Sequence, residues 1–200
     1  MSTINEDGML INAKVIHRRF PNIEHGQLKG VNAIVVHQTD APTLQHTLNA
    51  YVAGGNGAHF LIDKNGLIYQ TASMNRRCFH VGRLIKSKCL VIDKKSCDSE
   101  SIAKILAMSW ASQIKALDAH ERKKLYPHRY PVNSDSIGIE LVGKSIDSKN
   151  YEEVTSLQNL SLQWLVGELY RHFSLSSDDV YRHPDVSYKH PGEASTAIWK

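Results

Sequence analysis

The sequence predicts an α/β fold in a single domain, with a central mixed β-sheet flanked by helices. The chain has 200 residues, a usual length for one domain. Apolar runs typical of buried strands alternate along it with amphipathic helical segments, and no linker or internal repeat divides it. Apolar residues make up 42% and charged residues 22%, which excludes a disordered or fibrous chain.

The expected elements follow from apolar patterning and from the residues that start and stop them. In chain order they are a strand over 31–37, a helix over 43–53, a β-hairpin over 58–71, a helix over 99–125, a strand over 136–142, a helix over 152–173 and extended chain over 180–183. The first strand is a nearly continuous apolar run, as buried strands are. Thr43 can cap the first helix, and a glycine-rich segment after Ala53 ends it. Lys64-Asn65-Gly66 is a tight-turn signal between two apolar runs, which predicts the hairpin.

The second half of the chain carries two amphipathic helices on either side of a strand. Ser99 can cap the first of them, whose apolar residues recur at three- and four-residue spacings. Tyr126-Pro127 then ends the helical pattern. The strand over 136–142 is apolar apart from one carboxylate, and the last helix again has one apolar face.

Charge and cysteine content exclude several classes of protein. The net charge of +4 comes from scattered basic residues, so we expect no nucleic-acid partner. No stretch approaches the roughly 18 apolar residues of a membrane span, and the first residues lack a basic and then apolar leader. Three cysteines, Cys78, Cys89 and Cys97, predict reduced thiols rather than a disulfide framework. We therefore expect a protein made in the cytoplasm without a signal peptide.

Eleven histidines are the most unusual feature of the composition. His37 ends an apolar strand, and His183 and His190 each precede a proline in one later loop. Three protein ligands with an open fourth position form a catalytic zinc site, and imidazole is the commonest metal ligand. In the alternative interpretation, His37 bonds to backbone at a strand end and the two His-Pro pairs are only turns.

Glu140 and His80 are further candidates for chemistry. A carboxylate in an apolar strand costs several kcal/mol unless it is paired or faces a cavity. Strand alternation places Glu140 on one face with Gly138 and Val142. Glu140 is then either an edge residue facing solvent or a general base whose pKa is raised by partial desolvation. His80 is either a substrate or oxyanion contact or a structural residue, and we assign His59 to structure.

The order of these motifs resembles the zinc-dependent N-acetylmuramoyl-L-alanine amidase family, the amidase-2 group that includes peptidoglycan recognition proteins. The resemblance covers about residues 31–192. It rests on five segments in the same order, at 34–39, 58–70, 79–82, 136–142 and 183–192.

The resemblance implies a set of site residues. His37 and His183 would be zinc ligands, and His190, directly before Pro-Gly, would be the third, where family members commonly have Asp or Cys. Glu140 would be the catalytic carboxylate, since other members carry a tyrosine where this chain has alanine. Lys189 resembles the catalytic lysine of the family, one position closer to the third ligand. His80 would contact the substrate.

The sequence therefore predicts a zinc hydrolase of peptidoglycan or of muropeptides. It would cleave the amide bond between N-acetylmuramic acid and the L-alanine of the stem peptide. The alternatives are a non-catalytic peptidoglycan-binding module and a zinc peptidase that cuts within the stem peptide. Residues 83–133 form an insertion that the motifs do not explain, either a wall of the substrate groove or a partner surface.

The expected place of action follows from the substrate. Cell-wall substrate lies outside the cytosol, so we expect delivery to the periplasm without a leader, as an antibacterial effector with an immunity protein or as a phage-type lysin. The alternative is a cytoplasmic enzyme that recycles wall fragments.

Overall fold

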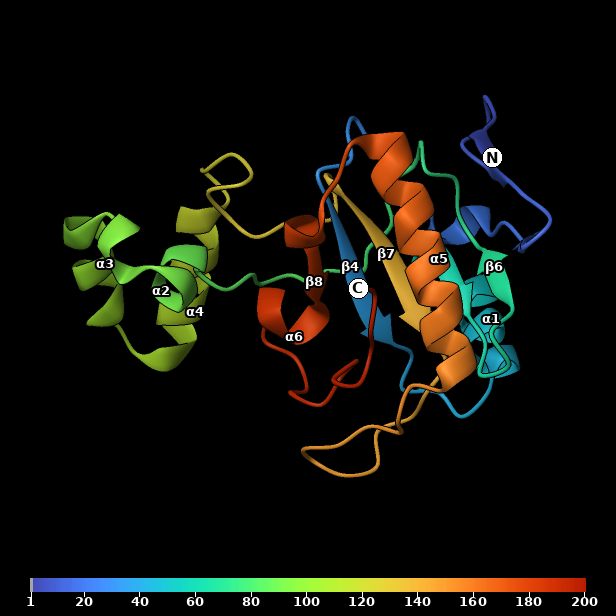
Figure 1. Ribbon diagram of the computed structural model, residues 1–200. Helices are drawn as coiled ribbons and strands as arrows, with labels where there is room; N and C mark the ends of the chain where they lie inside the picture. The colour runs from blue at the N-terminus through green and yellow to red at the C-terminus, as the bar shows by residue number, and fades with distance from the viewer. Residues whose placement is uncertain (1) are drawn as a thin grey trace.

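A six-stranded mixed sheet forms the centre of the protein, whose computed structural model describes residues 2–200 (Figure 1). The strand order is β3-β6-β5-β7-β4-β8, and within this sheet β5 and β6 are the one antiparallel pair among the described residues. Strands β1 and β2 form a separate antiparallel pair. The strands are β1 Thr3–Ile4, β2 Leu10–Ile11, β3 Val15–His17, β4 Ala33–Gln38, β5 Phe60–Ile62, β6 Ile68–Gln70, β7 Ser136–Leu141 and β8 Val180–Arg182. The predicted mixed sheet, with a hairpin over 58–71, is confirmed.

Helices cover both faces of this sheet. They are α1 Leu44–Ala53, α2 Lys88–Ile92, α3 Ser99–Leu106, α4 Trp110–Glu121, α5 Ser156–Phe173 and α6 His183–Val186, with 3-10 turns η1 Pro21–Ile23, η2 Lys94–Ser96 and η3 Ser177–Asp179. Among residues 2–200, none of the helices combines the length and the hydropathy that crossing a bilayer requires.

Alternate residues of the two central strands point to different layers. The long helix α5 lies across one face, where its buried leucines pack against Ile34, Val36 and the isoleucines of β7 (Figure 1). The opposite face carries Val142 in a cluster with Leu48 and Tyr51 of α1. The predicted alternation in β7 is therefore confirmed, and Glu140 lies on the face away from α5.

The register of the sheet brings two candidate residues together. Strands β4 and β7 are parallel neighbours, and His37 lies directly beside Glu140 in their pairing. Both residues are close to the carboxyl ends of their strands, which is where open α/β sheets place their ligands. Sheet pairing alone therefore positions an imidazole next to a carboxylate.

The helix predicted over 99–125 is wrong as a single element. Asp98, rather than Ser99, caps α3 by accepting a hydrogen bond from the Ser101 backbone N–H. The chain leaves the helical conformation at Ser109, which is extended and precedes α4. Serine competes for backbone hydrogen bonds outside helices, so it favours a break where the apolar spacing alone suggested continuity.

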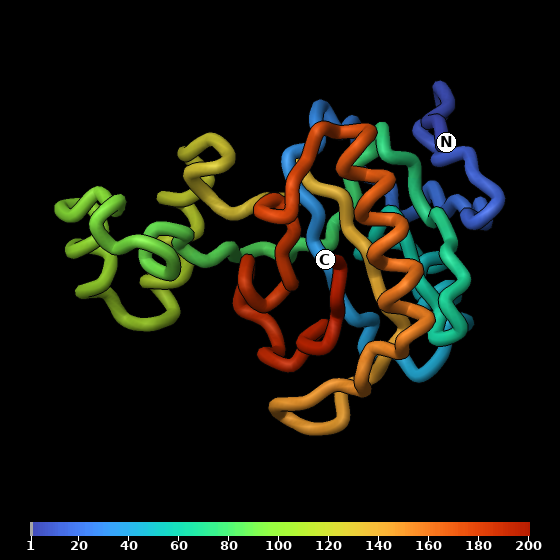
Figure 2. Tube along the Cα trace, in the orientation of Figure 1, coloured from blue at the N-terminus to red at the C-terminus, as the bar shows by residue number. Residues whose placement is uncertain are grey.

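Helices α2, α3 and α4 form a separate lobe beyond the β8 edge of the sheet (Figure 2). Ile102, Ile105 and Leu117 give this lobe a small core of its own. Two buried carboxylates of α4 hold the incoming chain. Asp118 accepts from the Ile85 N–H at 2.9 Å, and Glu121 accepts from the Ser87 hydroxyl at 3.0 Å. Buried carboxylates that accept such bonds fix the lobe at its root.

The lobe also corrects the cysteine prediction. Cys89 and Cys97 form a disulfide across eight positions, whereas Cys78 is a buried free thiol. The prediction of three reduced thiols was wrong because the turn between α2 and η2 folds back and brings the two Cα atoms to 5.3 Å. Sequence spacing does not reveal such a return of the chain.

The helix α5 offers a direct test of the core. Leu165 is completely buried against the sheet, so Leu165→Ala should lower the free energy of unfolding by about 2–5 kcal/mol. Leu160 lies on the same helix but is 62% exposed, and Leu160→Ala should change stability by no more than about 0.5 kcal/mol. Urea denaturation of both variants measures this. Equal losses would contradict the placement of α5.

Candidate active site and metal centre

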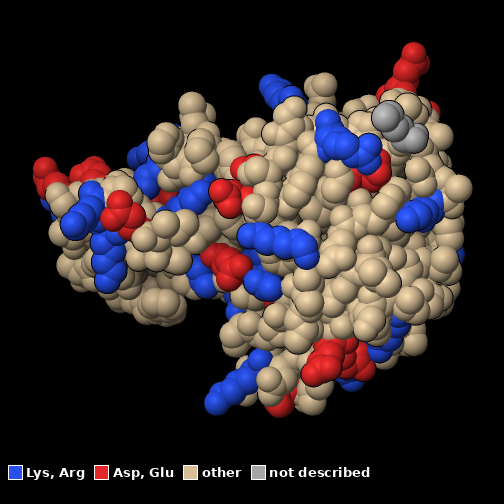
Figure 3. All heavy atoms as spheres, viewed as in Figure 1, with Lys and Arg blue, Asp and Glu red and all other residues tan. Residues whose placement is uncertain are grey.

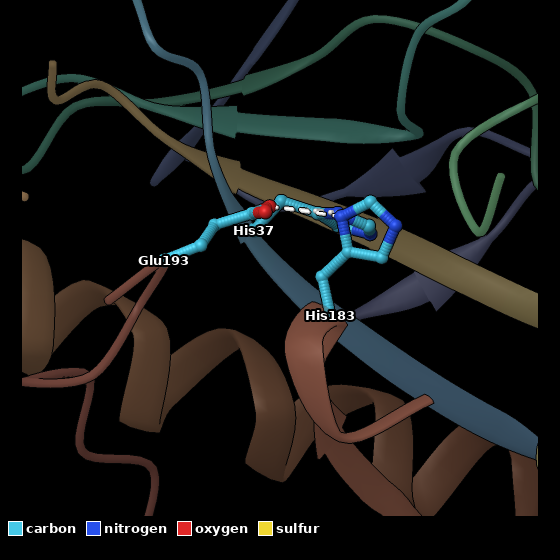
Figure 4. A group of neighbouring side chains, drawn as sticks. All are labelled: His37, His183 and Glu193. Carbon is cyan, nitrogen blue, oxygen red and sulfur yellow. Dashed lines mark hydrogen bonds and ion pairs between the residues drawn. The ribbon is translucent and has the colours of Figure 1, made fainter. Parts of the chain in front are cut away.

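Three buried side chains from distant parts of the sequence converge at one end of the sheet. They are His37 at the end of β4, His183 at the start of α6 and Glu193 in the C-terminal segment (Figure 4). Their ligand atoms all lie within 4.8 Å of one another. Such a cluster of two imidazoles and a carboxylate is a candidate metal centre.

Residues next to the two histidines hold Glu193 in place. Gln38, which follows His37, accepts a hydrogen bond from the Ala194 N–H through its Oε1 at 2.8 Å. Arg182, which precedes His183, donates from Nε to the Ala194 carbonyl at 2.9 Å. The segments that carry His37 and His183 therefore both bond to the backbone of Ala194, the residue directly after Glu193. These bonds fix the position of the Glu193 carboxylate although Glu193 lies outside any helix or strand.

Hydrogen bonds set which ring nitrogen of His183 faces the cluster. Its Nε2 lies 3.1 Å from the Val81 carbonyl, which can only accept a hydrogen bond. Nε2 must therefore carry the proton. The other nitrogen, Nδ1, lies 2.9 Å from Glu193 Oε1 and faces the cluster.

A second chain of hydrogen bonds orients His37. The Ser136 hydroxyl donates to the Val132 carbonyl, so toward His80 Nε2 it acts as an acceptor, as does the Ser136 carbonyl. His80 therefore donates from Nε2, and its Nδ1 accepts from His37 Nε2 at 3.1 Å. This leaves His37 Nδ1 unprotonated and 3.4 Å from Glu193 Oε1. Partners of this kind, behind the ligands, fix tautomer and ring direction in metal sites.

Electrostatics keep the cluster in the state that a cation requires. Burial, followed by the nearby His183, lowers the pKa of His37 to about 4, so this imidazole is neutral at pH 7. Burial alone would raise the pKa of Glu193, but the two imidazoles beside its carboxylate outweigh burial and lower that pKa to about 2. A neutral imidazole and an ionised carboxylate are both ligand forms.

The donor set fits zinc. Two neutral imidazole nitrogens and one carboxylate oxygen are a known set of three protein ligands for catalytic zinc, which keeps a fourth position open. The ring directions of His37 and His183 are fixed independently, by His80 and by Val81. The described residues therefore form a candidate zinc site.

Glu140 lies beside this cluster with an unsatisfied oxygen. Its Oε2 is shut off from solvent and has no hydrogen-bond partner anywhere in residues 2–200. Burial raises the pKa of Glu140 to about 8; the charge of Glu193 raises it too, and Lys189 acts in the opposite direction. A carboxyl group that has a buried oxygen without a partner and faces a pocket is a candidate proton carrier.

The loop before Glu193 carries the two other predicted residues, Lys189 and His190, and they differ in their relation to the cluster. His190 does not join the cluster, because its Nε2 donates to the Asp147 carbonyl at 2.7 Å and its Nδ1 accepts from the Gly192 N–H at 3.1 Å. Lys189 does turn toward the site, where its charge lowers the pKa of His37 and opposes the rise in that of Glu140.

The remaining candidate histidines have both ring nitrogens engaged. His80 is 7% exposed and is bonded to His37 and Ser136. His59 accepts from the Gly138 N–H and donates to the Arg76 carbonyl, which agrees with the structural role assigned to it. The hydrogen bonds of His80 are those of a residue that supports His37.

Glu193 belongs to the cluster but was not among the residues that the sequence analysis named. A detectable signal was present, since an acidic residue directly follows Pro191-Gly192 in the loop that begins at His183. The sequence analysis predicted a ligand at the residue before Pro-Gly, His190, instead.

These residues line one large cavity of about 960 Å³. His37, Glu140, His183 and Glu193 lie on its wall, together with residues of α1 and Arg83 and Arg122 of the insertion. A cavity of this size accommodates a ligand far larger than a metal ion and a water molecule.

The raised pKa of Glu140 predicts a pH-dependent stability for the protein without metal. Below pH 4.5 the carboxyl group is protonated in both the folded and the unfolded chain. Between pH 4.5 and about 8 the unfolded chain ionises first, so the folded state loses stability as the pH rises. Glu140→Gln cannot ionise and should avoid this loss.

Urea denaturation of metal-free wild type and Glu140→Gln at pH 4.5 and pH 8 measures the effect. The stability of the variant relative to wild type should increase at the higher pH. A difference independent of pH would contradict the burial of an ionisable Glu140.

A mixed α/β sheet with a buried His-His-carboxylate cluster beside a poised carboxyl group defines a hydrolase with a candidate metal centre. The profile of the N-acetylmuramoyl-L-alanine amidase family, Amidase_2, matches residues 27–194. The chain belongs to this family, and its enzyme class is that of a peptidoglycan amidase. The resemblance seen over about 31–192 is thereby confirmed.

Solved structures support the fold. The chain is similar to a selenomethionine derivative of AmpD, with a TM-score of 0.56, 17% identity and coverage of 98% of this chain and 96% of that one. It is similar to the catalytic domain of XlyA, with a TM-score of 0.52, 19% identity and coverage of 90% and 88%. It also resembles AmpDh3 from Pseudomonas aeruginosa in complex with anhydromuramic pentapeptide, with a TM-score of 0.52, 17% identity and coverage of 78% and 52%. No curated protein matches the chain in sequence.

Proposed function

We propose that this protein is a zinc-dependent amidase that hydrolyses the bond between N-acetylmuramic acid and the L-alanine of the peptidoglycan stem peptide. The observation that carries the proposal is the buried cluster of His37, His183 and Glu193 beside Glu140, in a chain of the amidase family. The cavity around the cluster has room for a muropeptide.

The proposed zinc ligands are His37 Nδ1, His183 Nδ1 and a carboxylate oxygen of Glu193. Zinc held there would polarise the scissile carbonyl and lower the pKa of water. His80 and the Val81 carbonyl keep both imidazoles in the ligand tautomer. Glu193 takes the place that the sequence analysis gave to His190.

Glu140 is the proposed general base and acid. Its unpartnered Oε2 can accept the proton of the attacking water and then deliver it to the amine nitrogen of L-alanine as the amide bond breaks. A bound cation beside Glu140 favours its ionised form, which is the form that accepts a proton.

Lys189 is the proposed oxyanion stabiliser. It extends past Gly82, so that its Cε would lie 3.4 Å from a Cβ added to that glycine, and its charge reaches both His37 and Glu140. An ammonium group there can donate to the oxygen that becomes negative in the transition state, an interaction worth about a hundred- to a thousand-fold in rate. The nitrogens of His80 are already engaged, so we assign His80 to positioning rather than to the substrate.

The Cys89–Cys97 disulfide supports action outside the reducing cytosol, because disulfides persist in oxidising compartments. Peptidoglycan lies in such a compartment. Delivery as an effector with an immunity protein, or as a phage-type lysin, remains the prediction made from the sequence.

Digestion of defined muropeptides, read by mass spectrometry, tests the proposed function. An amidase releases the intact stem peptide and leaves N-acetylmuramic acid with a free lactyl carboxylate. Products shortened within the stem peptide would show a peptidase instead. Binding without any cleavage by the zinc-loaded protein would show a recognition module.

A further inference from the structure

The insertion brings positive charge to the wall of the catalytic cavity. Arg83 and Arg122 both line the cavity that contains the metal cluster, and both lie in the 83–133 segment. The face in Figure 3 is indented where the helical lobe meets the body, and both basic and acidic side chains lie near this junction. The insertion therefore contributes to the substrate site and is more than a separate lobe.

Arg122 is held rigidly in this wall. Its Nε bonds to the Asp118 carboxylate at 2.9 Å, and its Nη2 donates to the Arg83 carbonyl at 2.9 Å. Asp118 also accepts from the Ile85 N–H, so the pair is tied to the root of the lobe. The hydrogen atoms on Nη1 remain free of any bond to the part of the chain that the structure describes. A guanidinium already held in place loses little freedom when it binds a ligand.

Arg83 is the more available cation. It is exposed on the cavity wall, and its guanidinium makes no ion pair or hydrogen bond with any residue from 2 to 200. Arg83 follows Val81 by two residues, and the Val81 carbonyl accepts a hydrogen bond from His183 of the metal cluster. Two residues of chain span at most about 7 Å, so the backbone of Arg83 lies within a short distance of the segment that contacts His183.

The chemistry of the two groups selects a carboxylate. Planar guanidinium groups bind carboxylates through paired N–H donors, and two of them on the wall of one cavity favour an anionic ligand over a neutral one. Under the proposed function the substrate has a glycan part, whose N-acetylated sugars are neutral, and a stem peptide, whose acidic residues carry carboxylates. The cationic wall therefore suits the peptide part of the substrate.

We propose that Arg83 and Arg122 form a subsite that binds a free carboxylate of the stem peptide within the first residues after the scissile amide. This inference rests on the proposed function and adds a preference for acidic over amidated stem peptides. The insertion would then determine which stem peptides the cavity binds.

Two matched substrates test the subsite. They are N-acetylmuramoyl-L-alanyl-D-isoglutamate with a free α-carboxylate and the corresponding D-isoglutamine with an α-carboxamide. In both the γ-carboxyl is blocked as a methylamide, so the α group is the only carboxylate and the only difference. For the zinc-loaded wild type we expect a lower KM for the acid. Arg83→Gln should raise the KM for the acid by on the order of 10-fold, the effect of one charged hydrogen bond, and leave its kcat and both constants for the amide within about 2-fold. Arg122→Lys, which keeps the charge but loses the planar fork, should raise the same KM.

Lys123→Gln is the matched control. Lys123 is exposed beside Arg122 but does not line the cavity, so its loss removes the same charge without touching the subsite. A KM that rises equally for both substrates, or that rises in Lys123→Gln as in Arg83→Gln, would overturn the subsite.

Calorimetric binding of both substrates separates this inference from the proposed function. Binding to Glu140→Gln and to Glu140→Gln with Arg83→Gln does not depend on turnover. If wild type cleaves neither substrate, the proposed function fails, while a preference for the acid that disappears with Arg83 still supports the subsite. Equal affinity for acid and amide in the presence of Arg83 would refute the subsite even if wild type is an amidase.

Discussion

Glu140→Gln should lower kcat for muropeptide cleavage by about a thousand-fold or more. Glu140 lies beside the metal cluster and has a buried oxygen without a hydrogen-bond partner. Under the proposed function it carries out both proton transfers. Glutamine fills the same space but cannot accept a proton. KM should change little, because the substrate contacts remain. Steady-state kinetics with a defined muropeptide measures the effect.

The metal content of the variant provides the control for this prediction. Glu140→Gln should still bind about one zinc, since Glu140 is not among the proposed ligands. Glu153→Gln removes an exposed carboxylate of the same type and should keep wild-type activity. Substantial activity in Glu140→Gln would assign proton transfer to another group.

Glu193→Ala should weaken zinc binding by at least about a hundred-fold and abolish activity at low zinc concentration. Loss of a supporting residue behind a ligand typically costs 10- to 100-fold in metal affinity, and loss of a ligand itself should cost at least as much. The variant also leaves His37 and His183 without their shared carboxylate partner. Competition with a chromogenic zinc chelator measures the affinity.

His190→Ala distinguishes the two candidates for the third ligand. Both ring nitrogens of His190 bond to backbone groups, so its removal should change zinc affinity only a few-fold. If His190→Ala loses the metal while Glu193→Ala keeps it, the third ligand is His190 and the loop 187–193 rearranges around the ion.

Much of the sheet could be predicted from sequence because strand alternation is a local rule. The apolar run of β7 interrupted by Glu140 showed which face that carboxylate occupies, and the same pattern in β4 placed His37 at a strand end. The structure adds the register, which pairs these two residues directly. The register between two strands depends on the whole sheet, so it cannot be read from the sequence of either strand alone.

Features that depend on irregular chain could not be predicted in the same way. Glu193 reaches the cluster because Gln38 and Arg182 hold Ala194, and these contacts leave no periodic trace in the sequence. The Cys89–Cys97 disulfide likewise depends on a turn after α2. A periodic apolar pattern is insensitive to a three-residue break, so it merged α3 and α4 into one helix.

Reconstitution of metal-stripped wild type with zinc tests the central claim most directly. Activity on a defined muropeptide should be absent after chelation and return in proportion to added zinc, with a break at about one equivalent and with the intact stem peptide as product. Full activity in the stripped protein, or tight zinc binding without cleavage of that bond, would contradict the account.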